Sequence, residues 1–261
     1  MKKVTKQKIR RGILYAVLIV IVALVALLAD WGLIQSSFFD LEIAVDMFPD
    51  VFLVGARNTI VYTFFAFAFG LILALVLALM KRSEVTPYRW IATSYIELFR
   101  GLPALVTIIF VGLGLPIALG ITIPGGLLGQ GTVGLGLVAG AYMAETIRAG
   151  IEAVPRGQME AARSLGMSKG AATRSIVLPQ AFRIIIPPLT NELVLLIKDT
   201  SLLFVLGSTP ATKELTKFGR DLMTQKFNGT PLIVIALVYL IITLPLTRFV
   251  AQLEKRAARA R

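Results

Sequence analysis

Ionisable residues inside otherwise apolar stretches are the first candidates for chemistry in this chain. Glu97 and Arg100 are three positions apart, as are Glu145 and Arg148, so each pair occupies one face of a helix. Charged groups at membrane depth are costly, and each one suggests a function and needs a partner. Two interpretations stay open for these pairs: a charged inner vestibule or gate, or interfacial ion pairs that fix helix ends near the cytoplasm.

The segment Ile176–Ile197 combines polar residues with prolines. Pro179, Pro187 and Pro188 remove backbone donors and predict a kinked or broken helix, which is tolerated at depth only within protein or beside a water-filled cavity. Polar candidates lie along this segment and at its outer end: Arg183, Asn191, Glu192, Lys198, Asp199, Thr200 and Ser201. The pattern is typical of a translocation path lined by discontinuous helices. The alternative for the adjacent lysine and aspartate is an ion pair at the interface.

Several kinds of catalysis are excluded by residue types that the chain lacks. Cysteine and histidine are both absent, which excludes disulfides, thiol nucleophiles, imidazole proton relays and His/Cys metal sites. No G-x-x-x-x-G-K-[ST] motif occurs, and the stretch Gly166–Lys169 has the wrong spacing for one. No serine pairs recognisably with a lysine or carboxylate base. An integral-membrane enzyme is therefore disfavoured, and any ATP hydrolysis belongs to another polypeptide.

The elements that must position these residues are membrane-spanning helices. Hydrophobic residues make up 56% of the 261 and charged residues 16%, with a mean hydropathy of +0.80, which excludes both a soluble domain and a disordered chain. Six apolar spans are predicted from long gaps between charges: 12–29, 58–80, two within 101–144 joined by the turn-rich stretch Ile121–Gly131, Ile176–Ile197, and 227–247. A signal peptide is the disfavoured alternative for the first, because no small-residue cleavage site follows it.

Glycines in the third and fourth predicted spans are spaced for close helix approach: Gly112, Gly114, Gly134, Gly136 and Gly140. Packing within one subunit is favoured over a seam between subunits.

The net charge of +12 is distributed unevenly, because the segments 1–11, 81–100, 148–183 and 248–261 hold 21 of the 27 Lys and Arg. The positive-inside rule predicts that both termini are cytoplasmic. Charge divided among four short segments also argues against nucleic acid as a partner.

The stretch 155–179 between two spans is too polar to cross a membrane and too well patterned for a linker. Gln158–Leu165 predicts a short helix, Gly166 ends it, and Ser168 caps a second helix over Lys169–Leu178. Pro179 then marks the entry to the next span. The result is a cytoplasmic helical hairpin, which either ties two spans together or offers a rigid docking helix whose small residues, Ala161 and Ala162, let a partner come close.

This stretch resembles the EAA loop of binding-protein-dependent ABC importer permeases, through Glu160-Ala161-Ala162, Gly166 and Ile176-x-Leu178-Pro179. Three further runs are similar to those of the polar amino acid (histidine/glutamine/glutamate/arginine-type) branch: Glu97-x-Phe99-Arg100-Gly101-x-Pro103, Ala141-Tyr142-x-x-Glu145-x-x-Arg148 with Gly157-Gln158, and Asn191-Glu192 with Lys198-Asp199-Thr200-Ser201-Leu202. The resemblance covers about residues 52–252. The usual core of that family has five spans with its N-terminus outside, so one span is added here, Gly12–Ile34.

The resemblance implies an all-α integral membrane protein in three parts: a basic N-terminus, extra helix and acidic external segment (1–51), a permease core (52–252), and a basic tail (253–261). It implies that the EAA-type loop couples to an ATPase through Glu160, Ala161, Ala162, Ser164, Leu165 and Gly166. The implied partners are a cytoplasmic ABC ATPase dimer, a second permease subunit (identical or similar), an extracytoplasmic amino-acid-binding protein and the lipid bilayer.

The function that this resemblance implies is ATP-driven import of polar amino acids across a prokaryotic inner membrane. We expect the chain itself to bind no cofactor, with ATP and magnesium held by the ATPase. Two alternatives remain: an importer permease for another small solute, such as an organic anion, a peptide or a sugar, and an ATP-independent secondary transporter or channel.

Overall fold

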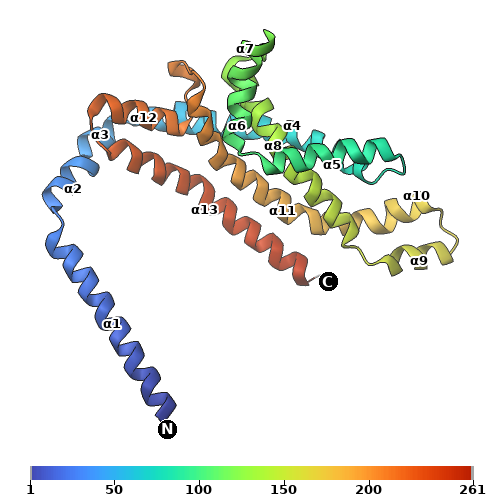
Figure 1. Ribbon diagram of the computed structural model, residues 1–261, viewed down its shortest axis with the longest axis horizontal. Coiled ribbons are helices and arrows are strands. Elements are labelled where there is room, and N and C mark those ends of the chain that lie inside the picture. Colours follow the sequence, from blue (N-terminus) through green and yellow to red (C-terminus); the bar gives the residue numbers. More distant parts are fainter. Residues whose placement is uncertain (1, 260–261) are drawn as a thin grey trace.

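A computed structural model describes residues 2–259, and all regular elements in that range are helices (Figure 1). The N-terminal part consists of α1 (Lys2–Leu28), α2 (Trp31–Phe38) and α3 (Leu41–Asp46). The body contains α4 (Arg57–Lys81, preceded by a π-helical turn over Val51–Ala56), α5 (Thr86–Gly101), α6 (Ala104–Ile109), a π-helical turn (Phe110–Gly114), α7 (Leu115–Leu119) and α8 (Gly126–Glu152). It continues with α9 (Arg156–Ser164), α10 (Lys169–Ala172), a π-helical turn (Thr173–Val177), α11 (Leu178–Asp199), 3-10 segments (Thr200–Val205, Pro210–Thr212), α12 (Leu215–Lys226) and α13 (Thr230–Arg259).

Within residues 2–259, five helical stretches are long and apolar enough to cross a membrane: Arg10–Leu28, Val51–Lys81, Gly126–Glu152, Lys169–Val205 and Thr230–Arg256. A sixth span results if α5 and the helix Ala104–Leu119 count as one, although they are bent by 106° at the break between them. The all-α membrane fold predicted from the sequence is confirmed. The span predicted at the start of 101–144 is instead this bent pair, which begins fifteen residues earlier at Thr86.

The predicted turn at Ile121–Gly131 is wrong at its C-terminal half. Only Gly120–Gly125 is non-helical, and Gly126 already begins α8. Gly120 and Gly125 have φ angles of +66° and +88°, which is why this short connection needs glycine. The later glycines serve packing: a Cβ at Gly131 would lie 2.8 Å from a methyl group of Leu203. Glycine is common both in turns and in tightly packed membrane helices, so the sequence could not separate the two uses.

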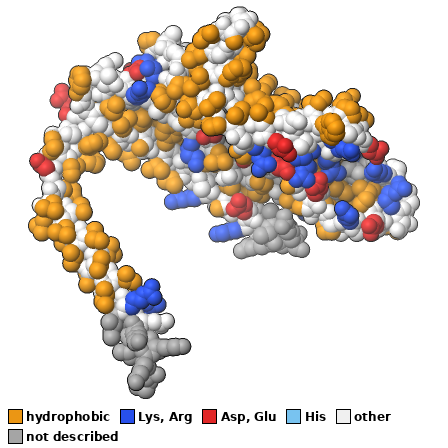
Figure 2. All heavy atoms as spheres, in the orientation of Figure 1, with side chains coloured by type: hydrophobic (Ala, Val, Ile, Leu, Met, Phe, Trp, Pro, Cys, Tyr) orange, Lys and Arg blue, Asp and Glu red, His pale blue; other side chains and the backbone are white. Residues whose placement is uncertain are grey.

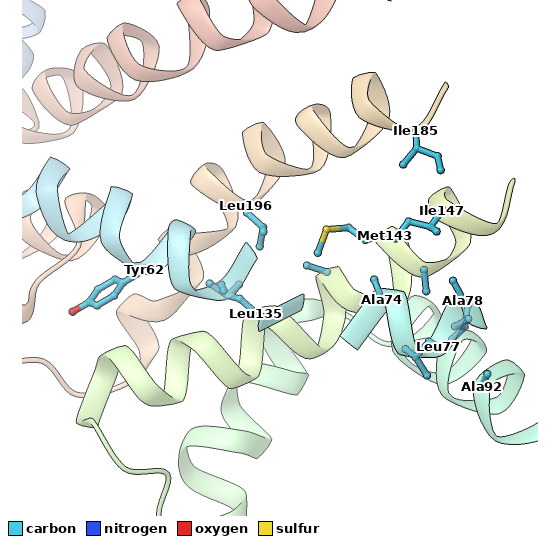
Figure 3. Close-up of a cluster of buried hydrophobic side chains, with 14 of the residues drawn as sticks. Tyr62, Ala74, Leu77, Ala78, Ala92, Leu135, Met143, Ile147, Ile185 and Leu196 are labelled. Atoms are coloured by element: carbon cyan, nitrogen blue, oxygen red, sulfur yellow. The ribbon is translucent and has the colours of Figure 1, made fainter. Parts of the chain in front are cut away.

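Close approach of α4 and α8 forms the centre of the body. A Cβ at Gly70 on α4 would lie 3.0 Å from the Gly136 carbonyl oxygen and 3.3 Å from the Gly140 nitrogen, both on α8. A Cβ at Gly134 would lie 3.3 Å from Ile108, and a Cβ at Gly112 would lie 2.5 Å from a methyl group of Leu206, both within this chain. The packing interpretation of these glycines within one subunit is therefore confirmed. Around this contact lies a buried apolar cluster (Figure 3), including Tyr62, Ala74, Leu77, Ala78, Ala92, Leu135, Met143, Ile147, Ile185 and Leu196.

Of the kink or break predicted at Pro187 and Pro188, the break is wrong, because α11 is continuous from Leu178 to Asp199 with both prolines inside it. Nor does Pro179 separate a hairpin helix from the span. Through the π-helical turn, α10 runs into α11, so that Lys169–Val205 is one continuous helical stretch. Neighbouring helices allow prolines inside membrane helices, so the missing donors do not force an end. The discontinuous span lies elsewhere, at Leu102–Pro103 between α5 and α6.

The first helix, α1, extends away from the body (Figure 1), and the apolar side chains of its part Arg10–Leu28 face outward (Figure 2). None of its membrane-spanning window is buried. After it, α2 and α3 lead back to a second, smaller apolar cluster that joins α3, α12 and α13 and includes Met47, Val51, Leu215, Ile235 and Val238.

Candidate functional site

The hairpin of α9 and α10 is held by a glycine-based helix end. Gly166 has a φ of +85°, and its N–H donates to the Arg163 carbonyl at 3.0 Å. The Met167 N–H donates to the Ala162 carbonyl at 3.1 Å, which completes the double hydrogen bond of a Schellman motif. Ser168 then caps α10 by accepting from the Ala171 N–H at 3.2 Å. These are the stop and cap predicted from the sequence.

The hairpin presents polar and apolar side chains to solvent. Glu160, Ala161, Ser164 and Gly166 are exposed, and Leu165 retains 85% of its accessible surface although it is a large apolar residue. Ala162 differs, since it is only 5% exposed and α9 folds back against the segment Thr173–Val177. The small residue available to a partner is therefore Ala161 alone, while Ala162 packs within the chain.

A cavity of about 380 Å³ lies between the α5–α6 bend, α8 and α11. Its lining consists of Leu102, Pro103, Ala104, Leu135, Val138, Ala139, Tyr142, Glu192, Leu195, Leu196 and Asp199. Glu192 and Asp199 are seven residues, or two helical turns, apart and therefore on one face of α11. Both are partly buried, and within residues 2–259 neither carboxylate has an ion-pair partner within 4.0 Å. The cavity is thus apolar with two acidic groups on one wall.

The bend between α5 and α6 brings Arg100 to the edge of this region. Its guanidinium lies 5.5 Å from the centre of the Tyr142 ring, and the Tyr142 hydroxyl donates to the Arg100 carbonyl at 3.4 Å. Glu97 is exposed and forms no ion pair with Arg100 among the contacts of the described residues. Of the two interpretations for Glu97 and Arg100, the ion pair is therefore not formed, because the arginine stacks on an aromatic ring instead.

The other predicted pair is present and belongs to a larger network. Glu145 on α8 binds both Arg148 and Lys81, the latter with a distance of 2.9 Å between Nζ and Oε2, and Arg148 also pairs with Glu152. Two cations and two carboxylates alternate, so the network neutralises itself while it joins the C-terminal ends of α4 and α8. This geometry favours the interpretation that the pair fixes helix ends.

The remaining predicted path residues do not line the cavity. Arg183, Asn191 and Lys198 are exposed on α11. Thr200 is fully buried, and its hydroxyl donates to the Ile197 carbonyl at 2.6 Å, while Ser201 is partly buried. No group of three or more acidic residues that could hold a metal ion occurs in the described part of the chain.

Sequence reasoning missed two features of this molecule. Tyr142 lines the cavity, and the only sequence signal for this role was its position in the run Ala141–Arg148. Glu214 is fully buried beyond the C-terminal end of α11, where its carboxylate accepts from the Thr216 and Lys217 N–H groups, each at 2.6 Å, and from the Tyr239 hydroxyl at 3.3 Å. Burial raises the pKa of Glu214 to about 7 against the effect of these hydrogen bonds. An acidic residue directly before a helix was the available signal for this cap.

Comparisons with known proteins agree with this arrangement. The family model described as "Binding-protein-dependent transport system inner membrane component" matches residues 66–259. The probable glutamine ABC transporter permease protein GlnM of Bacillus subtilis is 37% identical over 214 residues, which cover 79% of this chain and 93% of that protein. The arginine transport system permease protein ArtQ of the same organism is 37% identical over 188 residues, 72% of this chain and 83% of that protein.

Solved structures are similar as well. The crystal structure of an amino acid ABC transporter with histidines has a TM-score of 0.75 and 35% identity, and the match covers 83% of this chain and 98% of that one. A chain in the crystal structure of a bacterial ABC transporter involved in the import of the acidic polysaccharide alginate shares the fold at 14% identity, with a TM-score of 0.66 and a match to 97% of this chain and 99% of that one.

Proposed function

The chain belongs to the family of binding-protein-dependent transport system inner membrane components, and we propose that it is the permease subunit through which an ATP-driven importer moves polar amino acids. The observation that carries the proposal is the connection between the two candidate sites. The exposed hairpin α9–α10 leads without a break into α11, and the same helical stretch, Lys169–Val205, carries Glu192 and Asp199 into the cavity. A force applied to the hairpin therefore reaches the cavity wall through one continuous helix.

The partner on the hairpin would be a cytoplasmic ABC ATPase. The surface of Glu160, Ala161, Ser164 and Leu165 offers a charge, a small residue and a large exposed apolar side chain on a helix whose end is fixed by Gly166. Closing and opening of the ATPase pair would move this helix and so alternate the access of the cavity. Shifting a membrane conformation from 1:99 to 99:1 needs about 5.5 kcal/mol of differential binding. ATP binding and hydrolysis on the separate subunit would provide that difference.

The cavity suits a small zwitterion. Glu192 and Asp199 would receive the ammonium group of an amino acid, and the apolar wall formed by Leu135, Val138 and Leu195 would contact the carbon skeleton. Relatives named as glutamine, arginine and cystine permeases support amino acid cargo of differing side chains. Polar amino acids as a class therefore fit better than any one member.

The other partners follow from the direction of transport. An extracytoplasmic binding protein would deliver the amino acid to the outer face formed by α3 and α12, and a second permease subunit would complete the path. The chain lies in the inner membrane as a multi-pass protein. Since Lys and Arg concentrate on the hairpin side, we place α9, α10 and both termini in the cytoplasm.

Substitution of Gly166 tests the coupling role. Valine rarely adopts a positive φ, and at Gly166 it would strain or displace the hairpin by about 1–2 kcal/mol. We expect Gly166→Val to reduce ATP-dependent uptake into vesicles about five- to thirty-fold while the protein still inserts. Gly170→Val is the matched control, because a Cβ at either glycine meets no atom within 4 Å and only Gly166 has the positive φ. Full uptake by Gly166→Val would contradict the coupling role.

Substitution of the cavity carboxylates tests the path. We expect Glu192→Gln and Asp199→Asn each to lower uptake about tenfold, because a hydrogen bond to a charged group is worth about 1.5–3 kcal/mol. Glu84→Gln is the control, since that side chain is 96% exposed at the cytoplasmic turn after α4. Uptake should be measured with a panel of labelled amino acids and with the complete complex. Unchanged uptake of every amino acid in both variants would exclude the cavity from the path.

A further inference from the structure

A second cavity lies at the base of the hairpin, apart from the one on α11. Its volume is about 630 Å³, and it is lined by Lys81, Arg82, Ile151, Glu152, Val154, Pro155, Arg156, Met159 and Val177. These residues come from the end of α4, the end of α8, the start of α9 and the segment before α11. We propose that this cavity binds the phosphate headgroup of an anionic phospholipid from the cytoplasmic leaflet.

The charges of the lining are the first argument. Lys81 is held by Glu145, and Glu152 is held by Arg148, so these two lining residues are already neutralised. Arg82 and Arg156 are exposed, and neither forms an ion pair or a side-chain hydrogen bond with any residue of the described chain. Two guanidinium groups therefore remain at the rim without a counter-charge. A phosphate group accepts the paired N–H donors of arginine with matching geometry.

The position of the cavity is the second argument. Lys81 is the last residue of one membrane-spanning stretch and Glu152 is the last of another, so the cavity lies where the apolar spans end. This is the depth at which phospholipid phosphates lie. Lys and Arg side chains also gather at the end of the molecule that carries α9 and α10 (Figure 2). Basic pockets between membrane helices on the cytoplasmic side are recognised sites for anionic lipid headgroups.

The floor of the cavity distinguishes a lipid from other anions. Val154 and Val177 are buried, and Ile151 and Met159 are partly buried against the main apolar cluster. A glycerol backbone and the start of an acyl chain can cover this apolar floor, whereas a free phosphate ion leaves it in water. An acidic protein segment would place polar backbone groups on it, which costs free energy unless each one finds a hydrogen bond.

The position also gives the bound lipid a role, and this part rests on the proposed function. Arg82 belongs to the turn after α4, and Arg156 is the first residue of α9. A headgroup that contacts both would join the docking helix to the body at its base. Anionic lipid would then favour transmission of the ATPase motion, so uptake would rise with the anionic lipid content of the membrane.

The binding test uses the full-length chain purified in detergent with its ATPase, and native mass spectrometry of retained phosphatidylglycerol. Each basic residue near an anionic surface contributes about 1 kcal/mol, so Arg82→Gln/Arg156→Gln should weaken retention about fivefold per arginine. Arg89→Gln/Arg174→Gln is the control, because both of these arginines are exposed and cytoplasmic but outside the cavity. Arg82→Lys/Arg156→Lys should retain part of the binding, because the charge remains and the paired donors do not.

Three results would overturn the lipid site. Equal phosphatidylglycerol retention by the glutamine variant and its control would exclude these arginines. Loss of the ATPase from the purified glutamine variant, with lipid retention unchanged, would show that the cavity is a protein contact. Displacement of the lipid by millimolar inorganic phosphate alone would identify a site for the free ion.

Uptake into vesicles with and without phosphatidylglycerol then tests the role. We expect stimulation by the anionic lipid in the control variant and none in the glutamine variant. Equal stimulation of both would refute the role of this site in coupling. Absence of ATP-driven uptake of every amino acid, in all vesicles, would refute the proposed function, while the mass spectrometric result would still decide the lipid site.

Discussion

Two helices of equal length show opposite relations to their surroundings. α1 and α8 each contain 27 residues and are both apolar enough to span a membrane. None of the spanning window of α1 is buried, whereas 61% of the corresponding window of α8 is buried inside the body. The more apolar helix is thus the one that faces outward. For a membrane protein, high hydropathy indicates exposure to lipid, since apolar side chains gain nothing by leaving lipid tails for protein.

What α8 has and α1 lacks is a series of small residues facing a neighbour. Gly136 and Gly140 let the backbone of α4 come within contact distance, and Met143 and Ala144 continue the same buried surface. α8 also carries Glu145, whose carboxylate binds Arg148 on the same helix and Lys81 at the end of α4. The contrast indicates that close packing and satisfied charges hold the body together, and that α1 contributes to it only through the chain.

The strongest test of this contrast is a leucine at a packed glycine. A Cβ at Gly136 would lie 3.1 Å from the Ala66 carbonyl oxygen, so a full leucine side chain forces α4 and α8 apart. We expect Gly136→Leu to lower the free energy of unfolding by more than about 3 kcal/mol, the upper range for overpacking. The measurement is the midpoint of thermal unfolding in detergent.

The matched substitution in α1 is Gly12→Leu, since a Cβ at Gly12 meets no atom within 4 Å. We expect no loss of stability there. A similar decrease in both variants would refute the contrast, because it would mean that a larger side chain is unfavourable at any glycine of these helices.

The sequence could predict this contrast only in part. Gaps between charges located the apolar stretches, and the combination of Gly166 and Ser168 predicted the hairpin stop and cap, because helix ends depend on residues within one turn of each other. The bend at Leu102–Pro103 and the continuity of α11 through Pro187 and Pro188 were not predicted. Whether a proline ends a membrane helix depends on neighbouring helices, and these are distant in the sequence.

The candidate site, like the fold, could be predicted from the sequence only in part. Glu192 and Asp199 could be singled out as charges in an apolar segment, but their common cavity depends on the α5–α6 bend, which the sequence did not locate. The spacing of Glu97 and Arg100 left an ion pair open as one interpretation, yet the arginine stacks on the ring of Tyr142, which lies on another helix. Spacing along one helix predicts which side chains share a face, and contacts between helices decide which of them meet.

A second test compares a buried carboxylate with a more exposed one in the segment between α11 and α13. Glu214 is buried with a pKa of about 7, above the usual value of 4.5, so the folded state binds its proton more tightly than the unfolded state does. This stabilisation is fully present below about pH 4.5 and is lost as the pH rises through 7. We expect the free energy of unfolding to fall by about 1 kcal/mol between pH 6 and pH 8, measured by thermal unfolding in detergent.

Asp221 provides the control, because it lies nearer the surface between Lys213 and Lys217, with Oδ–Nζ distances of 2.6 and 2.8 Å. Although burial opposes the effect, hydrogen bonds from both lysines lower the pKa of Asp221. Its contribution is therefore constant above about pH 4 and decreases only in acid. Glu214→Gln should remove the slope between pH 6 and pH 8, and Asp221→Asn should leave it. Persistence of the slope in Glu214→Gln would refute its assignment to this carboxylate.

The smallest effect is expected from rearranging α1. A variant in which the apolar residues of the window Arg10–Leu28 are permuted keeps the hydropathy and length that membrane insertion requires, but changes every side chain that a neighbour could recognise. Because no residue in that window is buried, we expect the unfolding midpoint of the body to change by less than the equivalent of about 0.5 kcal/mol, and uptake to stay the same. A stability decrease would show that α1 packs on its own body. Reduced uptake at unchanged stability would instead show that its side chains contact another subunit, so that α1 and α8 would differ in which protein surface they meet.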